Sequence, residues 1–251
     1  SLGDLKLWFR YLYLVVSLSF LLPLLTHIRR TVLSTKVNAG KLADYARNQG
    51  YKKVVIFYNP DDTYSKNVKG QFESLFKAQN EEVIRSINLA DPLLDTSAEI
   101  LKINEQDKAD AIVLFPNTEL TSVALAIARA QRSKKLPLVG GNALYSQDTL
   151  RSGGKAFEGL VISVDWFAGE QNSKEFADTA KERWGGQISW RTVTAYNATQ
   201  AFIDAISRSD NPTRQTILEN LKSVNLSSNE TPVLVKVVKG SDGLFKFEQV
   251  K

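Results

Sequence analysis

From residue 30 onwards, apolar runs of strand length alternate with amphipathic stretches of helix length. Short runs rich in Val and Ile predict buried strands, and apolar residues at helical spacing predict the helices between them. The expected strands cover residues 53–58, 82–87, 111–115 and 136–139, and the expected helices cover residues 38–49, 65–79, 97–106 and 120–132. This alternation predicts an α/β fold, a parallel sheet with helices on both faces.

The pattern becomes mostly helical after Asp165 and ends in two short apolar runs. The expected helices cover residues 172–184 and 192–207, and a third helix is expected to begin near Pro212. The expected strands of a terminal hairpin cover residues 233–238 and 244–247. The predicted organisation is an apolar segment over residues 1–29, an α/β lobe over residues 30–161, and helices with a hairpin over residues 162–251.

Residues 7–28 form an apolar segment rich in Leu and aromatic residues. No charged residue occurs between Tyr11 and Leu25, and Arg10 and His27 flank the run. This flanking pattern is typical of a membrane or signal anchor, although a comfortable span needs about 20 apolar residues. A buried part of the core and an aberrant sequence are the alternatives. We expect a chain without residues 1–28 to be more soluble and to keep the lobe folded.

The composition is that of a globular protein and excludes several kinds of site. Of the 251 residues, 43% are hydrophobic and 24% are charged, with a net charge of +5. Acidic and basic residues are interspersed, so no nucleic-acid partner is expected. The sequence contains no Cys, which excludes disulfides and thiolate catalysis, and its one histidine, His27, cannot form a multi-histidine metal site. We expect no cofactor and no metal.

The motifs of common α/β enzymes are missing. Neither the dinucleotide fingerprint nor the Walker A pattern follows an expected strand. The pair Gly140-Gly141 is better explained by a tight turn with close backbone approach than by a phosphate loop. Similarly, Asp61-Asp62 is typical of a turn that caps the next helix. No nucleophile and base are paired by the pattern, so we predict a protein without catalytic turnover.

Polar side chains instead follow the carboxyl ends of three expected strands. Tyr64 follows the first, Asn117 and Thr118 follow the third, and Asn142 follows the fourth. In open α/β sheets, small ligands bind in the crevice outside these ends. Asn and Tyr can each donate and accept hydrogen bonds, which suits a zwitterionic or amide-bearing ligand. The alternative is that Asn117 and Thr118 cap helices. The pattern alone leaves both interpretations open.

The order and spacing of several segments resemble a known family. From about Arg30 to Lys251, the chain is similar to the C-terminal two-thirds of the leucine/isoleucine/valine-binding substrate-binding proteins of ABC transporters. The segments that carry the resemblance are LADYARNQGYKKVVIFYNPDDTYSKN, ADAIVLFPNTELTSVALAIARA, LPLVGGNALYS, FEGLVISVDWF and VTAYNATQAFIDAI.

The resemblance implies a type I periplasmic binding protein fold, in which two Rossmann-like α/β lobes close on a ligand. Residues 30–161 would be the second lobe, and residues 162–225 would supply helices that return to a first lobe that is largely missing from this sequence. Tyr64, Asn117 and Thr118 match ligand contacts of the family. Asn142 matches a polar or acidic residue that meets the ligand's amino group, and asparagine lacks the charge that would pair with an ammonium.

The function implied is that of an extracytoplasmic solute-binding protein. Its ligand would be small and polar, such as a branched-chain amino acid or an amide-like molecule, and its partner would be an ABC transporter permease or a sensor domain. A periplasmic or extracellular location follows, with membrane contact only through residues 1–29. The alternatives are a remnant or interaction domain that keeps the fold without binding ligand, and a Rossmann-like enzyme.

Overall fold

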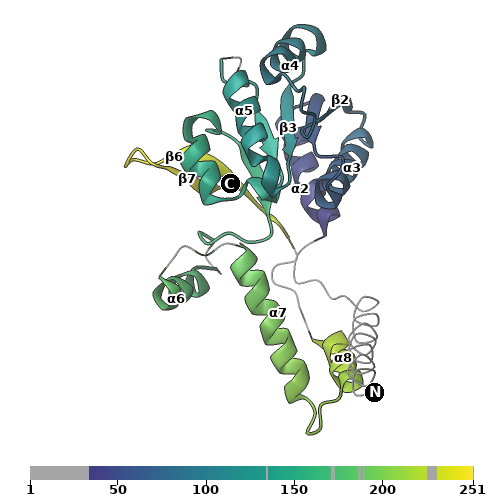
Figure 1. Cartoon of the computed structure of the whole chain (residues 1–251), viewed down its shortest axis with the longest axis vertical. Helices are drawn as coiled ribbons and strands as arrows, with labels where there is room; N and C mark the ends of the chain where they lie inside the picture. The colour runs from purple at the N-terminus through teal and green to yellow at the C-terminus, as the bar shows by residue number, and fades with distance from the viewer. Residues whose placement is uncertain are drawn as a thin grey trace, which may run out of the picture. The chain divides into compact units, whose positions relative to one another are not determined.

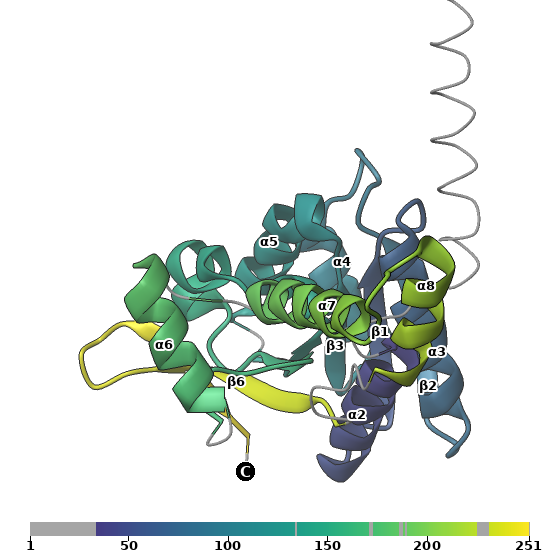
Figure 2. The ribbon, with the colours of Figure 1, turned by 90° about the horizontal axis from the view of Figure 1, so that it is seen from below.

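The computed structural model describes residues 34–133, 135–170, 173–185, 188, 190–224 and 231–250. Contacts divide the chain into two compact units, and the larger contains Val32–Val193 and Asn229–Lys251. The smaller unit includes Thr194–Ser228. Figures 1 and 2 show the elements of both units, and each unit is described by itself.

The described part of the larger unit is built on one seven-stranded sheet with the order β2-β1-β3-β4-β5-β6-β7. Strands β1 to β5 pair in parallel, whereas β6 pairs antiparallel with β5 and β7 antiparallel with β6. The strands are β1 (Lys53–Tyr58), β2 (Glu82–Asn88), β3 (Ala111–Phe115), β4 (Leu138–Gly140), β5 (Val161–Val164), β6 (Val233–Lys239) and β7 (Phe245–Gln249). The predicted α/β lobe is confirmed, and the sheet is mixed rather than purely parallel.

Helices cover both faces of this sheet (Figures 1 and 2). Helices α2 (Thr35–Asn48) and α3 (Thr63–Lys77) pack against each other on one face, and α4 (Thr96–Lys102) and α5 (Thr121–Gln131) pack on the other. Side-chain caps set several helix starts. Asp62 Oδ1 accepts the N–H of Ser65 at 2.7 Å, as predicted for the turn at Asp61-Asp62, and Asp95 caps α4 in the same way.

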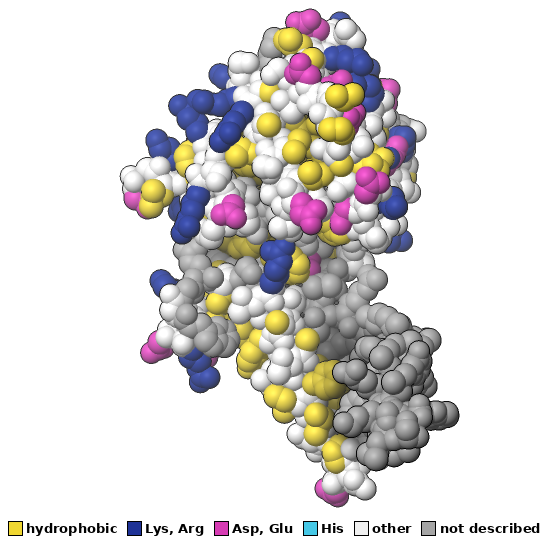
Figure 3. Space-filling model, viewed as in Figure 1, with side chains coloured by type: hydrophobic (Ala, Val, Ile, Leu, Met, Phe, Trp, Pro, Cys, Tyr) yellow, Lys and Arg dark blue, Asp and Glu magenta, His cyan; other side chains and the backbone are white. Residues whose placement is uncertain are grey.

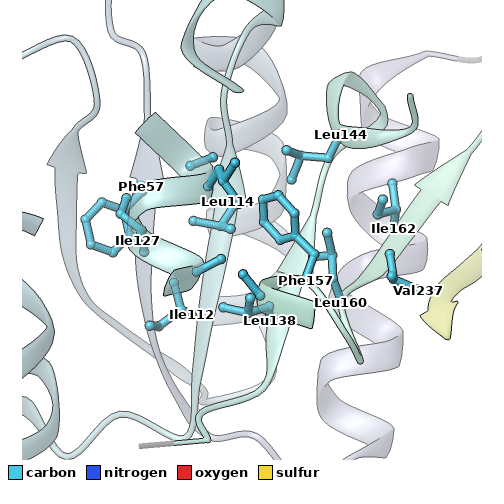
Figure 4. Packing of buried hydrophobic residues seen from close by; sticks show 14 of the residues in the cluster. Phe57, Ile112, Leu114, Ile127, Leu138, Leu144, Phe157, Leu160, Ile162 and Val237 are labelled. Atoms are coloured by element: carbon cyan, nitrogen blue, oxygen red, sulfur yellow. The ribbon is translucent and has the colours of Figure 1, made fainter. Parts of the chain in front are cut away.

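The two faces enclose separate apolar clusters. The α2/α3 face buries Phe72, Phe76 and Phe115, whose rings contact one another at centroid distances of 5.3 and 5.6 Å. The opposite face buries a larger cluster, and Figure 4 shows Phe57 and Leu114 of neighbouring strands among its members. Since both faces are covered, β1 and β3 are apolar almost throughout, which is why the sequence predicted them so clearly.

Three details differ from the sequence-based expectations. Strand β5 was not among the expected strands, because its sequence VISV is only four residues long and includes a serine. The helix expected over residues 97–106 ends at Lys102 and continues as a π-helical turn, Ile103–Asp107. The terminal hairpin was grouped with residues 162–251, yet it extends the sheet of the lobe through the β5–β6 pairing. The proposed domain limits themselves stay a prediction.

The helices expected in the C-terminal region are present as α6 (Lys174–Trp184), α7 (Trp190–Ser207) and α8 (Arg214–Ser223). In the smaller unit, Ala201 and Ala205 of α7 pack with Val224. Thr213 and Thr216 form a reciprocal capping box at the start of α8. Among the described residues of this cluster, only Ala201, Ala205 and Val224 are buried.

Within the described ranges, no helix is both long and apolar enough to cross a membrane. The apolar segment over residues 7–28 lies outside the described residues, so the structure does not test its interpretation. Figure 3 shows Lys and Arg side chains lying among Asp and Glu side chains over the visible face of the larger unit.

Candidate functional site

The carboxyl ends of β1, β3 and β4 meet at one edge of the sheet. The parallel register pairs Tyr58 with Phe115 and Leu114 with Gly140, so these strands end at nearly the same level. Asn117 and Asn142 each lie two residues beyond the last residue of their strand. The edge therefore gathers the polar residues that the sequence pattern singled out.

Tyr64 and Asn142 are brought together directly. Tyr64 is half-buried in the first turn of α3, and its hydroxyl oxygen accepts the backbone N–H groups of Asn142 and Ala143. The glycine at position 141 makes this contact possible, because a Cβ there would lie only 2.6 Å from Tyr64 Oη. This close approach is the role predicted for the glycine pair.

The protonation state of Tyr64 follows from its surroundings. Burial raises the pKa of Tyr64 above its ordinary value of 10, and the amides of Asn142 and Ala143 only partly offset this effect. The carboxylate of Asp165 raises the same pKa further. The phenol thus stays neutral at physiological pH. With its oxygen accepting two amides, its remaining capacity is one O–H donor.

A buried hydroxyl fixes the position of Tyr64. The Oγ of Ser65, which is fully buried, accepts the N–H of Asn59 at 2.7 Å and donates to the carbonyl of Phe115. These bonds tie the start of α3 to the ends of β1 and β3. The sequence analysis did not single out Ser65. Its signal is a small hydroxyl residue one position after the candidate tyrosine, in the first turn of a helix.

Asn117 carries a buried polar atom without a partner. It occupies the position before the short helix Thr118–Leu120, but its side chain makes no capping hydrogen bond there. Its Oδ1 is buried and has no hydrogen-bond partner among the described residues. The capping alternative therefore gains no support for Asn117. Thr118 is exposed at the start of that helix, and its carbonyl accepts the hydroxyl of Thr121 at 2.7 Å.

A second polar cluster, missed from the sequence, lies at the end of β5. Asp165 is 6% exposed, and its Oδ1 accepts Nδ2 of Asn38 at 2.6 Å. Asn38 Oδ1 in turn accepts the hydroxyl of Ser163 at 2.7 Å. The available signal was an aspartate directly after an apolar run, the same pattern that drew attention to Asn117 and Asn142. The described residues contain no group of three or more potential metal-ligating His, Cys, Asp or Glu side chains.

In open α/β sheets, the crevice outside the carboxyl ends of the strands is the usual place for a small-molecule ligand. Residues 28–242 match the sequence profile of the family described as periplasmic binding protein, and the chain belongs to this family. A member of this family is a binding component and not an enzyme, in agreement with the prediction of no catalytic turnover. A search of curated protein sequences gives no match.

Solved structures agree on the fold. A leucine-binding protein from Thermotoga maritima is 21% identical with a TM-score of 0.70, over 87% of this chain and 66% of that one. An ABC transporter substrate-binding protein from Sphaerobacter thermophilus is 21% identical with a TM-score of 0.72, over 86% and 64%. A solute-binding protein from Rhodopseudomonas palustris, solved with 3,4-dihydroxybenzoic acid, is 19% identical with a TM-score of 0.70, over 88% and 65%.

These similarities confirm the resemblance to type I binding proteins and the partial coverage of their fold. The chain spans about two thirds of the length of the solved relatives, 64 to 66% in the three above. At this level of identity, the similarity concerns the fold and not the ligand.

Proposed function

We propose that this chain is the ligand-binding lobe of an extracytoplasmic solute-binding protein that serves an ABC transporter or a sensor. The ligand is a small polar molecule held at the carboxyl edge of β1, β3 and β4. Tyr64, Asn117, Thr118 and Asn142 are the proposed contacts. The partner is the permease or sensor domain that receives the loaded protein, and the location is periplasmic or extracellular.

The observation that supports this proposal most is the unpartnered Oδ1 of Asn117. A buried acceptor without a hydrogen bond costs about 1–3 kcal/mol, so folded proteins rarely leave one unless something else fills it. This atom lies at the edge where Tyr64 and Asn142 meet. An N–H donor of a ligand bound there would satisfy it once the Asn117 side chain turns toward the ligand.

The chemistry of the four residues indicates the kind of ligand. All four side chains are uncharged. Tyr64 offers an O–H donor and Asn117 offers an acceptor. Such a set suits a ligand with its own donor and acceptor close together, such as an amide or a zwitterion. Because Asn142 carries no charge, the ammonium group of a free amino acid would find no ion pair among these four residues. An amide-like ligand would therefore lose less binding free energy at this site than a free amino acid.

The test is isothermal titration calorimetry on the full chain with leucine, isoleucine, valine and leucinamide. We expect one of these ligands to bind with 1:1 stoichiometry, and Asn117→Ala to weaken that binding by about 1–3 kcal/mol. Asn48→Ala, at an exposed position of α2, is the matched control and should leave the affinity unchanged. If no ligand of this panel binds at millimolar concentration, the alternative of a non-binding lobe is favoured instead.

A further inference from the structure

A large cavity lies within the larger unit, and it shares the loop after β4 with the carboxyl-edge site. Its volume is about 900 Å³, at the upper end of the size of small-molecule sites. The loops after β4 and β5, helix α6 and the β7 end of the hairpin line it. Its aromatic side chains pack on the cluster of the α4/α5 face, whereas Tyr64 packs on the cluster of the α2/α3 face. The aromatic lining of the cavity and Tyr64 thus pack on opposite faces of the sheet.

One wall of the cavity consists of aromatic rings. The ring centroid of Tyr145 lies 4.6 Å from that of Phe247 and 6.5 Å from that of Phe167. All three side chains are only partly buried, so their rings keep accessible area. This wall offers a planar ligand stacked or edge-on ring contacts, which contribute about 0.5–1.5 kcal/mol each beyond burial.

Backbone contacts hold the aromatic wall in place. The hydroxyl of Tyr145 accepts the N–H of Ala168, which joins the loop after β4 to the loop after β5. The backbone at Gly169, in the loop after β5, packs closely against the ring of Phe167. Only glycine allows this, because a Cβ at position 169 would lie 2.5 Å from Cε1 of Phe167. The rings are therefore positioned without a ligand, and little ordering remains to oppose binding.

The charged residues that line the cavity are predominantly basic. Arg151, Lys181 and Lys246 line it, against a single acidic residue, Asp178. Lys246 lies 3.6 Å from Glu248, but neither Arg151 nor Lys181 forms an ion pair within the part of the chain that the structure describes. Cations beside aromatic rings match a ligand with a flat apolar body and an anionic group.

We propose that this cavity is a second binding site, for a small aromatic carboxylate. The aromatic ring contacts Tyr145, Phe167 and Phe247, and the carboxylate pairs with Arg151 and Lys181. A bound aromatic acid would also link α6 to the hairpin, two elements that are far apart in the sequence. The proposal for this cavity does not rest on a ligand at Tyr64 or Asn117.

The experiment is calorimetric titration of the full chain with 2-naphthoate and with its neutral analogue 2-naphthalenemethanol. We expect naphthoate to bind 1:1, and the neutral analogue to bind about tenfold more weakly, since one charged contact is worth about that factor. Phe167→Ala and the double variant Arg151→Gln/Lys181→Gln should each weaken naphthoate about tenfold or more. The charge variants replace exposed side chains, so folding is not at risk.

Two controls make the result decisive. Lys52→Gln/Lys102→Gln removes two exposed positive charges outside the cavity lining and should leave naphthoate affinity unchanged. Asn142→Ala alters the carboxyl-edge site and should also leave it unchanged. The proposal is overturned if naphthoate does not bind at millimolar concentration, or if the cavity double variant and the control double variant weaken naphthoate binding equally. It is also overturned if only Asn142→Ala abolishes naphthoate binding. The last result would place the aromatic acid at the carboxyl edge.

Discussion

The contact between Tyr64 and the turn after β4 depends on the absence of a side chain at Gly141. In Gly141→Ala, the new methyl would lie 2.6 Å from Tyr64 Oη and 3.1 Å from Cδ1 of Phe115. Phe115 is fully buried against Phe72 and cannot yield easily, so the Tyr64 hydroxyl must move. It then loses its two backbone hydrogen bonds, each worth about 0.5–1.5 kcal/mol, and we expect a loss of about 1–3 kcal/mol in unfolding free energy.

Urea unfolding followed by circular dichroism measures this loss. Gly70→Ala is the matched control, because Gly70 lies inside α3 and its added methyl meets no atom within 4 Å. That variant should be neutral or more stable by about 0.5–1 kcal/mol, the usual gain for alanine in a helix. In a Tyr64→Phe background, Gly141→Ala should cost clearly less than in the wild type. Equal costs in both backgrounds would refute the proposed contact.

Three further predictions concern stability. Asn38→Ala should destabilise the protein by about 2–3 kcal/mol in urea unfolding, because it removes a hydrogen bond to the buried carboxylate of Asp165; a change below 0.5 kcal/mol, as expected for exposed Asn48→Ala, would contradict this role. Phe72→Ala should cost about 3–5 kcal/mol by the same assay, because the side chain is fully buried among other rings, and a smaller loss would indicate a loosely packed α2/α3 face. Burial raises the pKa of Tyr145 to about 12, partly offset by the amide of Ala168, so the contribution of Tyr145 to stability should be constant below pH 10 and be lost between pH 10 and 12. Tyr145→Phe should reduce that alkaline loss, and an unchanged pH profile would contradict the assignment.

The strands that could be predicted from sequence are those whose apolar runs are buried on both faces. Residues 53–58 and 111–115 coincide with β1 and β3, because a continuous Val/Ile-rich run bounded by polar turns suits only such a position. Strand β5 escaped because Ser163 interrupts its short run. That hydroxyl is satisfied by Asn38, 125 residues away, and no local pattern reveals such a partner.

The order of the strands was equally beyond local patterning. The terminal hairpin was predicted as a hairpin, but its place beside β5 depends on a pairing between Ile162 and Val235 that links distant segments. Nothing in the alternation of residues 233–247 specifies which edge of the sheet it joins.

The candidate site shows the same division between local and distant information. That polar residues follow strand ends is a local pattern, and it led to Tyr64, Asn117, Thr118 and Asn142. The contact between the Tyr64 hydroxyl and the amides after Gly141 depends on the order of the strands in the sheet. The sequence pattern does not specify that order. Ser65 and Asp165 each carry a local signal, but their hydrogen-bond partners lie on other elements, so the local pattern does not reveal what they bind.

The central claim is that a small polar ligand binds at the carboxyl edge, and calorimetry on two variants tests it most directly. With the ligand that binds the wild-type chain most tightly in the amino acid and amide panel, Tyr64→Ala and Asn142→Ala should each weaken affinity by about 1–3 kcal/mol, the cost of losing a buried hydrogen bond. Circular dichroism confirms that both variants are folded. Unchanged affinity in both folded variants would contradict a ligand site at this edge.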